Sequence, residues 1–130
     1  FELVETAVEQ RDGNLARVVD QLRAKGIRVA LDDFGTGHST LSRLRALPVD
    51  IVKIDRSFVA RATRSPRDLE LLRSMITLIR SVGAESVCEG IETQAQLETV
   101  RMLGTDSMQG FLLGKPRPIE AYSPPKRPAP

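Results

Sequence analysis

The stretch RVALDDFGTGHSTL, which runs from Arg28 to Leu41, joins an apolar run to two adjacent aspartates and a loop that contains glycines. Valine and leucine in such a run are typical of a buried strand. Neighbouring side chains on a strand point to opposite faces, so we expect one of Asp32 and Asp33 to point into the protein. A charge buried there needs a partner, because an isolated carboxylate is costly to remove from water. The stretch therefore predicts a strand that ends at a polar site.

Strand and helix patterns alternate on both sides of this stretch. Short apolar runs predict five strands, at residues 2–4, 27–33, 49–55, 85–92 and 108–114. Apolar residues at helical spacing, with capping signals at their ends, predict four helices, at residues 14–26, 39–47, 65–83 and 93–103. Such alternation is typical of an α/β fold with a parallel sheet. We expect one domain over residues 1–118 and an extended or disordered proline-rich tail over residues 119–130.

Composition argues against several classes of protein. The 130 residues carry a formal net charge of +2 and only 4% aromatic side chains, which gives neither the basic surface nor the stacking surface that binding to DNA or RNA needs. No apolar run approaches the length of a membrane span, so we expect no membrane contact from this segment. One cysteine, Cys88, fits a reducing compartment and a cytoplasmic location. A membrane anchor elsewhere in a longer parent protein stays open.

The polar residues that interrupt the apolar runs fall at the carboxyl ends of the predicted strands or close to them. They are Glu2 and Glu5, Asp32 and Asp33, Lys53 and Asp55, Glu89 and Glu92, and Gln109. The carboxyl ends of parallel strands converge on one face, where α/β proteins build their sites. We therefore expect these side chains to lie close together, although long stretches of sequence separate them.

Converging carboxylates predict a metal site. Two carboxylates about 4 Å apart repel each other by roughly 4 kcal/mol at an effective dielectric constant near 20. Lys53 alone cannot balance the four acidic residues Glu2, Asp32, Asp33 and Glu89. The chain has one histidine and one cysteine, so oxygen ligands must dominate, and these favour Mg²⁺, Mn²⁺ or Ca²⁺. A carboxylate cage for one or two Mg²⁺ or Mn²⁺ ions suits hydrolysis at phosphorus.

Each of these residues also has an ordinary structural interpretation. Asp32 and Asp33 could form a turn with one solvated carboxylate and one cap, and Lys53 could extend from a strand end into water. The FGTG segment, residues 34–37, lacks the spacing of a phosphate-binding fingerprint. His38 fits an ordinary loop residue better than a metal ligand. The common placement of the polar residues, and not any single one of them, favours a site.

Three segments, in this order, resemble the EAL domain of bacterial cyclic-di-GMP phosphodiesterases: ALDDFGTGHSTLSRLRALPVDIVKIDRSFV, CEGIET and QGFLLGKP. The opening FELVET resembles the family's E-L-T-E segment, with Val4 in place of the usual Thr, and His38 replaces a common Tyr. The resemblance extends from Phe1 to about Pro118. It implies the C-terminal portion of a (β/α)₈ TIM-like barrel that hydrolyses cyclic di-GMP to linear pGpG with Mg²⁺ or Mn²⁺.

The resemblance also implies a role for each polar residue. Glu2 and Asp32 match metal ligands, and Asp33 matches a ligand of a second metal. Lys53 matches the lysine near the attacking water and the phosphate, and Glu89 matches a general base or second-metal ligand. The positions that match supporting residues around the substrate are Glu5, Asp55, Glu92 and Gln109. The positions that match the loop over the site are Phe34, Gly35, Thr36 and Gly37.

The family's namesake Glu-Ala-Leu motif, a substrate-binding Arg and a metal-binding Asn would precede Phe1. The chain also opens on a strand-like run without an initiating Met, which suggests a piece of a longer protein. We therefore expect the chain alone to be inactive. Half a barrel exposes sheet edges and inner strand faces, so we expect it to form a homo-oligomer or to associate with the rest of its parent chain. On that inner face we expect the apolar positions Val29, Leu31, Val52 and Ile54.

Two other functions stay open. An EAL domain without turnover could sense cyclic di-GMP or bind a partner protein, although a sensor does not need all five charged residues of the predicted site. Lys53 could instead form a Schiff base in an unrelated barrel lyase. Release of pGpG in the presence of Mn²⁺ would identify the hydrolase, and borohydride trapping of Lys53 with a carbonyl substrate would identify the lyase.

Overall fold

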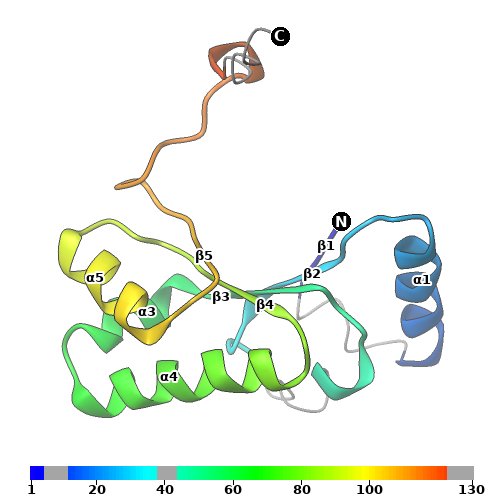
Figure 1. The fold of residues 1–130 in the computed structure, drawn as a ribbon, viewed down its shortest axis with the longest axis horizontal. Coiled ribbons are helices and arrows are strands. Elements are labelled where there is room, and N and C mark those ends of the chain that lie inside the picture. The colour runs from blue at the N-terminus through cyan, green and yellow to red at the C-terminus, as the bar shows by residue number, and fades with distance from the viewer. Residues whose placement is uncertain (5–11, 38–43, 123–130) are drawn as a thin grey trace, which may run out of the picture.

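A computed structural model describes residues 1–4, 12–37 and 44–122 of the chain. Five parallel strands form one sheet in the order β1-β2-β3-β4-β5, and α3, α4 and α5 lie together beside it (Figure 1). The strands are β1 (Glu2–Val4), β2 (Ala30–Phe34), β3 (Ile51–Ile54), β4 (Glu85–Cys88) and β5 (Ser107–Met108). The helices are α1 (Asp12–Ala24), α3 (Arg56–Ala62), α4 (Pro66–Ser81), α5 (Gln94–Leu103) and a short 3₁₀ helix, η2 (Ile119–Ala121). The expected α/β fold with a parallel sheet is confirmed.

The two faces of the sheet differ in character. Leu31 pairs with Val52, and both side chains are fully buried in the core that the helices cover. Residues one position away point to the other face, as strand alternation requires. Lys53 is such a residue, and it lies only partly buried.

The expectation that apolar residues line the open inner face is therefore wrong. Val29, Leu31, Val52 and Ile54 are all 0% exposed and belong to the hydrophobic core. Their register places them against the helices, because burying these side chains there removes apolar surface from water. The open face carries charged side chains instead, at the level where the candidate site lies.

Local capping signals in the sequence correspond closely to the helix ends. Ser65 caps α4 and its hydroxyl accepts a hydrogen bond from the Asp68 amide, with Pro66 at the first helical position. Thr93 and Gln96 form the expected capping box at the start of α5. The helix expected at residues 39–47 falls largely on residues 38–43, which lie outside the described residues. No helix among the described residues is long and apolar enough to span a membrane.

Two predictions about the elements are wrong. The helix α3 was not expected, because Asp55 was assigned to a strand end, whereas its side chain caps the helix by accepting from the Ser57 amide at 2.9 Å. The last strand was expected over residues 108–114, but β5 ends at Met108 and a turn follows. In that turn the amides of Leu113 and Gly114 donate to the carbonyl of Gly110. The predicted tail contains η2, and residues 123–130 lie outside the described part.

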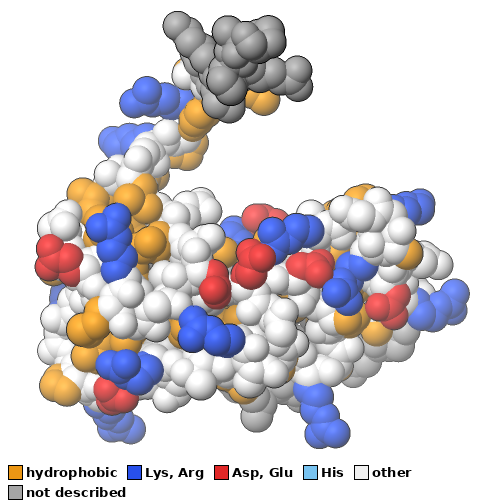
Figure 2. All heavy atoms as spheres, viewed as in Figure 1, with side chains coloured by type: hydrophobic (Ala, Val, Ile, Leu, Met, Phe, Trp, Pro, Cys, Tyr) orange, Lys and Arg blue, Asp and Glu red, His pale blue; other side chains and the backbone are white. Residues whose placement is uncertain are grey.

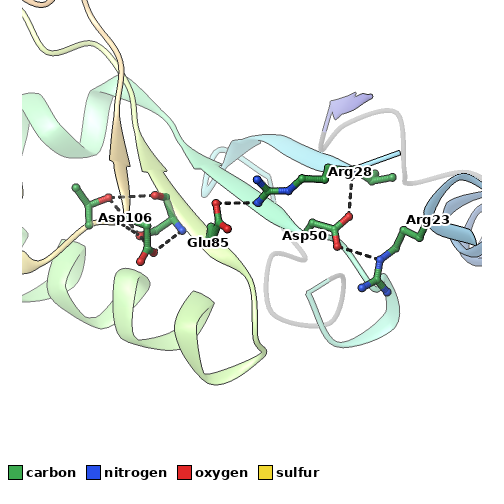
Figure 3. Close-up of polar contacts among 8 residues, drawn as sticks. Arg23, Arg28, Asp50, Glu85 and Asp106 are labelled. Carbon is green, nitrogen blue, oxygen red and sulfur yellow. Dashed lines mark hydrogen bonds and ion pairs between the residues drawn. The ribbon is translucent and has the colours of Figure 1, made fainter. Parts of the chain in front are cut away.

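Polar contacts join the amino ends of the strands, at the opposite end of the sheet from the predicted site (Figure 3). Asp50 accepts hydrogen bonds from Arg23 Nε at 3.0 Å and from the Val29 amide at 2.9 Å. Arg28 pairs with Glu85 at 2.7 Å. These contacts tie neighbouring connections together where the sheet begins, and so they act on stability rather than on chemistry.

Candidate metal centre

A bulge in β2 carries the two adjacent aspartates. The register between β2 and β3 shifts between Leu31 and Phe34, and Asp33 adopts a positive φ of 56°. The Asp33 amide donates to Asp32 Oδ1 at 2.9 Å, and the Thr36 amide and hydroxyl both donate to the Asp33 carbonyl, at 3.2 and 2.9 Å. A bulge redirects side chains that a regular strand would alternate. The bulge therefore changes which carboxylates can meet.

Strand alternation alone predicts that one of Asp32 and Asp33 points into the protein, but the bulge brings carboxylate oxygens of both residues to one place. Asp32, Asp33 and Glu89 each offer a carboxylate oxygen, and these oxygens all lie within 4.8 Å of one another. All three residues are partly buried. Glu89 directly follows β4, and its amide donates to the Ile54 carbonyl at 3.2 Å, so the two strand ends are held side by side.

Lys53, on β3 between these strands, contacts three carboxylates. Its Nζ atom lies 2.9 Å from Glu89 Oε1, 3.1 Å from Glu2 Oε1 and 3.2 Å from Asp32 Oδ1. The Lys53 side chain is only 12% exposed, whereas that of Glu2 is 58% exposed. Four of the residues that were expected to lie close together therefore do so around one ammonium group.

Burial and charge act in opposite directions on these groups. Burial alone would lower the pKa of Lys53, but hydrogen bonds to Glu89, Glu2 and Asp32 outweigh it and raise that pKa, so the ammonium stays charged. Burial raises the pKa of Glu89, and the nearby charges of Asp32 and Asp33 raise it further, while Lys53 opposes the shift. Glu89 thus behaves as a carboxylate with more than ordinary affinity for a proton.

The carboxylate cluster fits a hard divalent cation. Oxygens bound to one such ion are separated by no more than about twice the metal–oxygen distance, or about 4–5 Å. The three oxygens of Asp32, Asp33 and Glu89 meet that limit. Among the described residues, three carboxylates contact Lys53 and that of Asp33 lies beside two of them, so this group holds more acidic side chains than Lys53 can balance, and a cation would neutralise the remainder. Mg²⁺ and Mn²⁺ prefer such oxygen ligands.

A pocket of about 600 Å³ opens beside the cluster. Asp33 and Glu89 line it, together with three more of the residues expected around the site, Asp55, Glu92 and Gln109. Glu92 and Gln109 are exposed to solvent, and Asp55 also caps α3. The volume and the mixed polar and apolar lining are suitable for an organic ligand next to a metal.

The remaining expected site residues are placed differently. Phe34 is the last residue of β2 and is fully buried in the core, rather than lying in a loop over the site. Gly35, Thr36 and Gly37 follow it in the turn that the Asp33 carbonyl organises. Glu5 lies outside the described residues.

Sequence reasoning missed several residues that line the pocket. Arg56 and Lys115 bring positive charge to it, and Phe111 brings an aromatic ring, over which the Lys115 ammonium lies at 5.5 Å. A signal was present for Arg56, which directly follows the candidate Asp55. Phe111 falls inside the strand expected at residues 108–114, which hid its place in the pocket, and Lys115 directly follows that range.

The sequence and the fold of this chain are both similar to those of known proteins. The EAL domain family matches residues 1–116. The bifunctional diguanylate cyclase/cyclic di-GMP phosphodiesterase MucR of Pseudomonas aeruginosa is 41% identical over 115 residues, which are 88% of this chain and 17% of that protein. The EAL domain of Mycobacterium smegmatis DcpA is 44% identical with a TM-score of 0.83, over 88% of this chain and 52% of that one. A manganese/cy-diGMP complex of Klebsiella pneumoniae BlrP1 is 32% identical with a TM-score of 0.79, over 85% of this chain and 28% of that one.

The chain thus spans a small part of the curated relatives and about half of the solved EAL domain. EAL domains are TIM-type barrels, so the five parallel strands correspond to about half of a barrel. The match extends over nearly the whole chain and includes the strands that carry Glu2, Asp32 and Lys53, as well as Glu89 directly after β4. This chain belongs to the EAL domain family.

Proposed function

We propose that this chain supplies part of the active site of a metal-dependent phosphodiesterase that hydrolyses cyclic di-GMP to linear pGpG. The observation that carries the proposal is the meeting of Asp32, Asp33 and Glu89 within 4.8 Å of one another beside the ammonium group of Lys53. The EAL relatives named above add support, since one is named as a cyclic di-GMP phosphodiesterase and another binds manganese with the cyclic dinucleotide.

Glu2, Asp32, Asp33 and Glu89 would hold one or two Mg²⁺ or Mn²⁺ ions. When bound, such ions neutralise charge on the phosphate and so favour attack at phosphorus. Asp32 and Asp33 supply two carboxylate ligands from one bulge, which keeps the two ligands together without help from distant loops. Glu2 comes from the neighbouring strand and is the more exposed ligand.

Lys53 and Glu89 would carry the proton and charge chemistry. As the alternative to holding a metal ion, Glu89 takes a proton from the attacking water, a role that its raised pKa suits because a stronger base removes that proton more readily. The water oxygen bonds to phosphorus, the bond from phosphorus to one 3′ oxygen breaks, and that oxygen takes a proton from solvent while Glu89 returns to solvent the proton that it accepted. Lys53 stays protonated and stabilises the negative charge that grows on the phosphate oxygens.

The test requires a complete barrel. A chimera in which this chain replaces the matching residues of the MucR EAL region should release pGpG from cyclic di-GMP when Mn²⁺ is present. Asp32→Asn should abolish release and weaken Mn²⁺ binding, because ligand charge is what holds a hard divalent ion. Asp20→Asn, at an exposed position of α1, is the matched control and should keep full activity. Unchanged catalysis in Asp32→Asn would contradict the metal role, and binding without turnover in the parent chimera would favour the sensor.

A further inference from the structure

The turn that follows Asp33 packs directly against α3. A Cβ atom placed on Gly35 would lie 2.5 Å from Phe58 Cε2 and 2.7 Å from Phe58 Cζ, far inside van der Waals contact. The backbone of this turn therefore contacts the ring of Phe58 with no side chain between them, and the flexible end of Met75 on α4 lies beside it, with Cε 2.9 Å from the same Cβ position. Phe58 is partly buried, and the Arg61 guanidinium lies over its ring at 5.0 Å.

The turn that follows Glu89 packs against the same helix. A Cβ atom on Gly90 would overlap Arg56 Cβ and would lie 3.2 Å from Arg56 Cα. The backbone that carries Glu89 therefore touches the first turn of α3. The turn after β2, next to Asp33, thus contacts Phe58, and the turn after β4, next to Glu89, contacts Arg56. Both contact residues belong to the same short helix, two positions apart.

The helix α3 is itself fixed in place. Asp55 caps its amino end, and Val59 and Ala62 are buried in the core. The Asp55 amide donates to the Phe34 carbonyl at 3.5 Å, which is a long contact that links the start of α3 to the end of β2. On its other sides α3 packs against α4 and α5, as Figure 1 shows. Because contacts on several sides fix the position of α3, this helix can fix the backbone of both turns where they touch it.

We propose that α3 sets the spacing between Asp33 and Glu89, with Phe58 and Arg56 as positioning residues. The proposal rests on the proposed function, because a metal site tolerates errors of only about 0.5 Å in the placement of its ligands. The contacts at Gly35 and Gly90 couple the two turns tightly to α3, since the turn backbone touches a helix side chain with no rotatable side chain of its own in between. Neither residue needs to contact metal or substrate for this role, and Phe58 is not among the residues that line the pocket.

The test replaces only the part of Phe58 that reaches the turn. Leucine lacks the ε and ζ carbons that approach Gly35 but keeps the carbons nearer the backbone. In the metal-free 130-residue chain, Phe58→Leu should speed hydrogen exchange of the Thr36 amide, which donates to the Asp33 carbonyl, by about tenfold through local opening. The Ile27 amide, which lies just after α1 and donates to the Leu22 carbonyl, should keep its exchange rate. Leu78→Ala, a partly buried position of α4, is the matched control and should leave Thr36 unchanged.

A Mn²⁺ titration of the same variants then separates this proposal from the proposed function. Phe58→Leu should weaken Mn²⁺ binding about tenfold, as expected when the geometry of a ligand set loosens, and Leu78→Ala should not. Unchanged exchange at Thr36 in Phe58→Leu would overturn the positioning role, whether or not the chain binds Mn²⁺. Equal acceleration at Thr36 and Ile27 would also overturn it, since Phe58 would then act on global stability. Faster exchange at Thr36 in a chain that binds no Mn²⁺ would uphold the positioning role and count against the metal function.

Discussion

Lys53 carries the one positive charge in contact with the acidic cluster, among the residues that the structure describes. Its Nζ atom lies within 3.2 Å of three carboxylates, and its side chain is partly buried. A side chain held this way has few rotamers left, so its charge is preorganised. A preorganised charge fits the proposed role of Lys53, which is to stabilise a transition state rather than merely to attract a substrate.

In the chimera, we expect Lys53→Ala to lower turnover by on the order of a hundredfold or more, as is typical when a preorganised charge is removed. The affinity for cyclic di-GMP should change much less, because Lys53 is not among the residues that line the pocket beside the cluster. Steady-state kinetics together with equilibrium binding of the uncleaved substrate would measure both. An affinity loss as large as the loss of rate would make Lys53 a ground-state binder instead.

At the scale of single elements, the helix ends show how local physics decides structure. The Thr93 hydroxyl accepts a hydrogen bond from the Gln96 amide at 3.2 Å, and Gln96 Oε1 accepts from the Thr93 amide at 3.0 Å. Thr93→Ala should therefore lower the free energy of unfolding by about 1 kcal/mol, measured by urea titration. Thr99→Ala, inside the same helix, is the control. An equal loss of unfolding free energy in Thr99→Ala would show that the loss in Thr93→Ala does not come from the cap.

A polar contact at the start of β5 gives a pH-dependent prediction. Asp106 Oδ2 accepts from the Ser86 amide at 2.8 Å and from the Ser86 hydroxyl at 2.7 Å (Figure 3). These bonds, first the one from the backbone and then the one from the hydroxyl, lower the pKa of Asp106. The ionised carboxylate therefore stabilises the fold above the pKa of the unfolded chain, about 3.9, and that stability is lost as the pH falls through the lower folded pKa.

Asp106→Asn should accordingly flatten the decline of unfolding free energy below about pH 5. Urea titrations at pH 7, 5 and 3, each run on wild type and variant, would measure the difference. Ser86→Ala removes one of the donors and should flatten the decline partly. A steeper decline in Asp106→Asn than in the wild type would contradict the assignment.

The elements also show how much of the structure could be predicted from sequence. Caps and apolar spacing are local, so α1, α4 and α5 were found together with their approximate ends. The helix α3 was missed because RSFVARA mixes β-branched and aromatic residues with helix formers, and because Asp55 was read as the end of a strand. The last strand was overextended because an apolar run becomes strand only where a neighbouring strand pairs with it.

For the candidate site, too, some features could be predicted from the sequence and others could not. Its residues could be predicted as a group, because carboxyl ends of parallel strands converge whatever the sequence between them. The bulge at Asp33 could not, since a positive φ at a non-glycine residue depends on the surrounding packing. The bulge, and not simple alternation, lets both adjacent aspartates reach Glu89.

At the scale of the whole molecule, the sheet has two open edges in its described part. β1 pairs only with β2, and β5 pairs only with β4. Beyond β5 the chain extends away from the sheet, and hydrophobic side chains follow that segment (Figures 1 and 2). Phe111 is 60% exposed there, and Ile119 is 81% exposed. Open edges and exposed apolar surface together favour association.

We therefore expect the purified 130-residue chain to form dimers or larger assemblies at micromolar concentration. Light scattering coupled to size-exclusion chromatography would measure the mass. Addition of the remaining half of a related EAL domain should dissolve these assemblies, because the added half would cover the same edges. A stable monomer that also hydrolyses cyclic di-GMP would contradict both this expectation and the expectation that the chain alone is inactive.

The central claim is that Asp32, Asp33 and Glu89 form a site for a hard divalent cation, and a calorimetric titration with Mn²⁺ tests it most directly. The 130-residue chain should bind Mn²⁺, and Asp33→Asn should weaken that binding by about tenfold or more, because a charged ligand is lost from the cage. Asp20→Asn should bind as the wild type does. Absence of Mn²⁺ binding in the wild-type chain, or equal affinity in Asp33→Asn, would contradict the account.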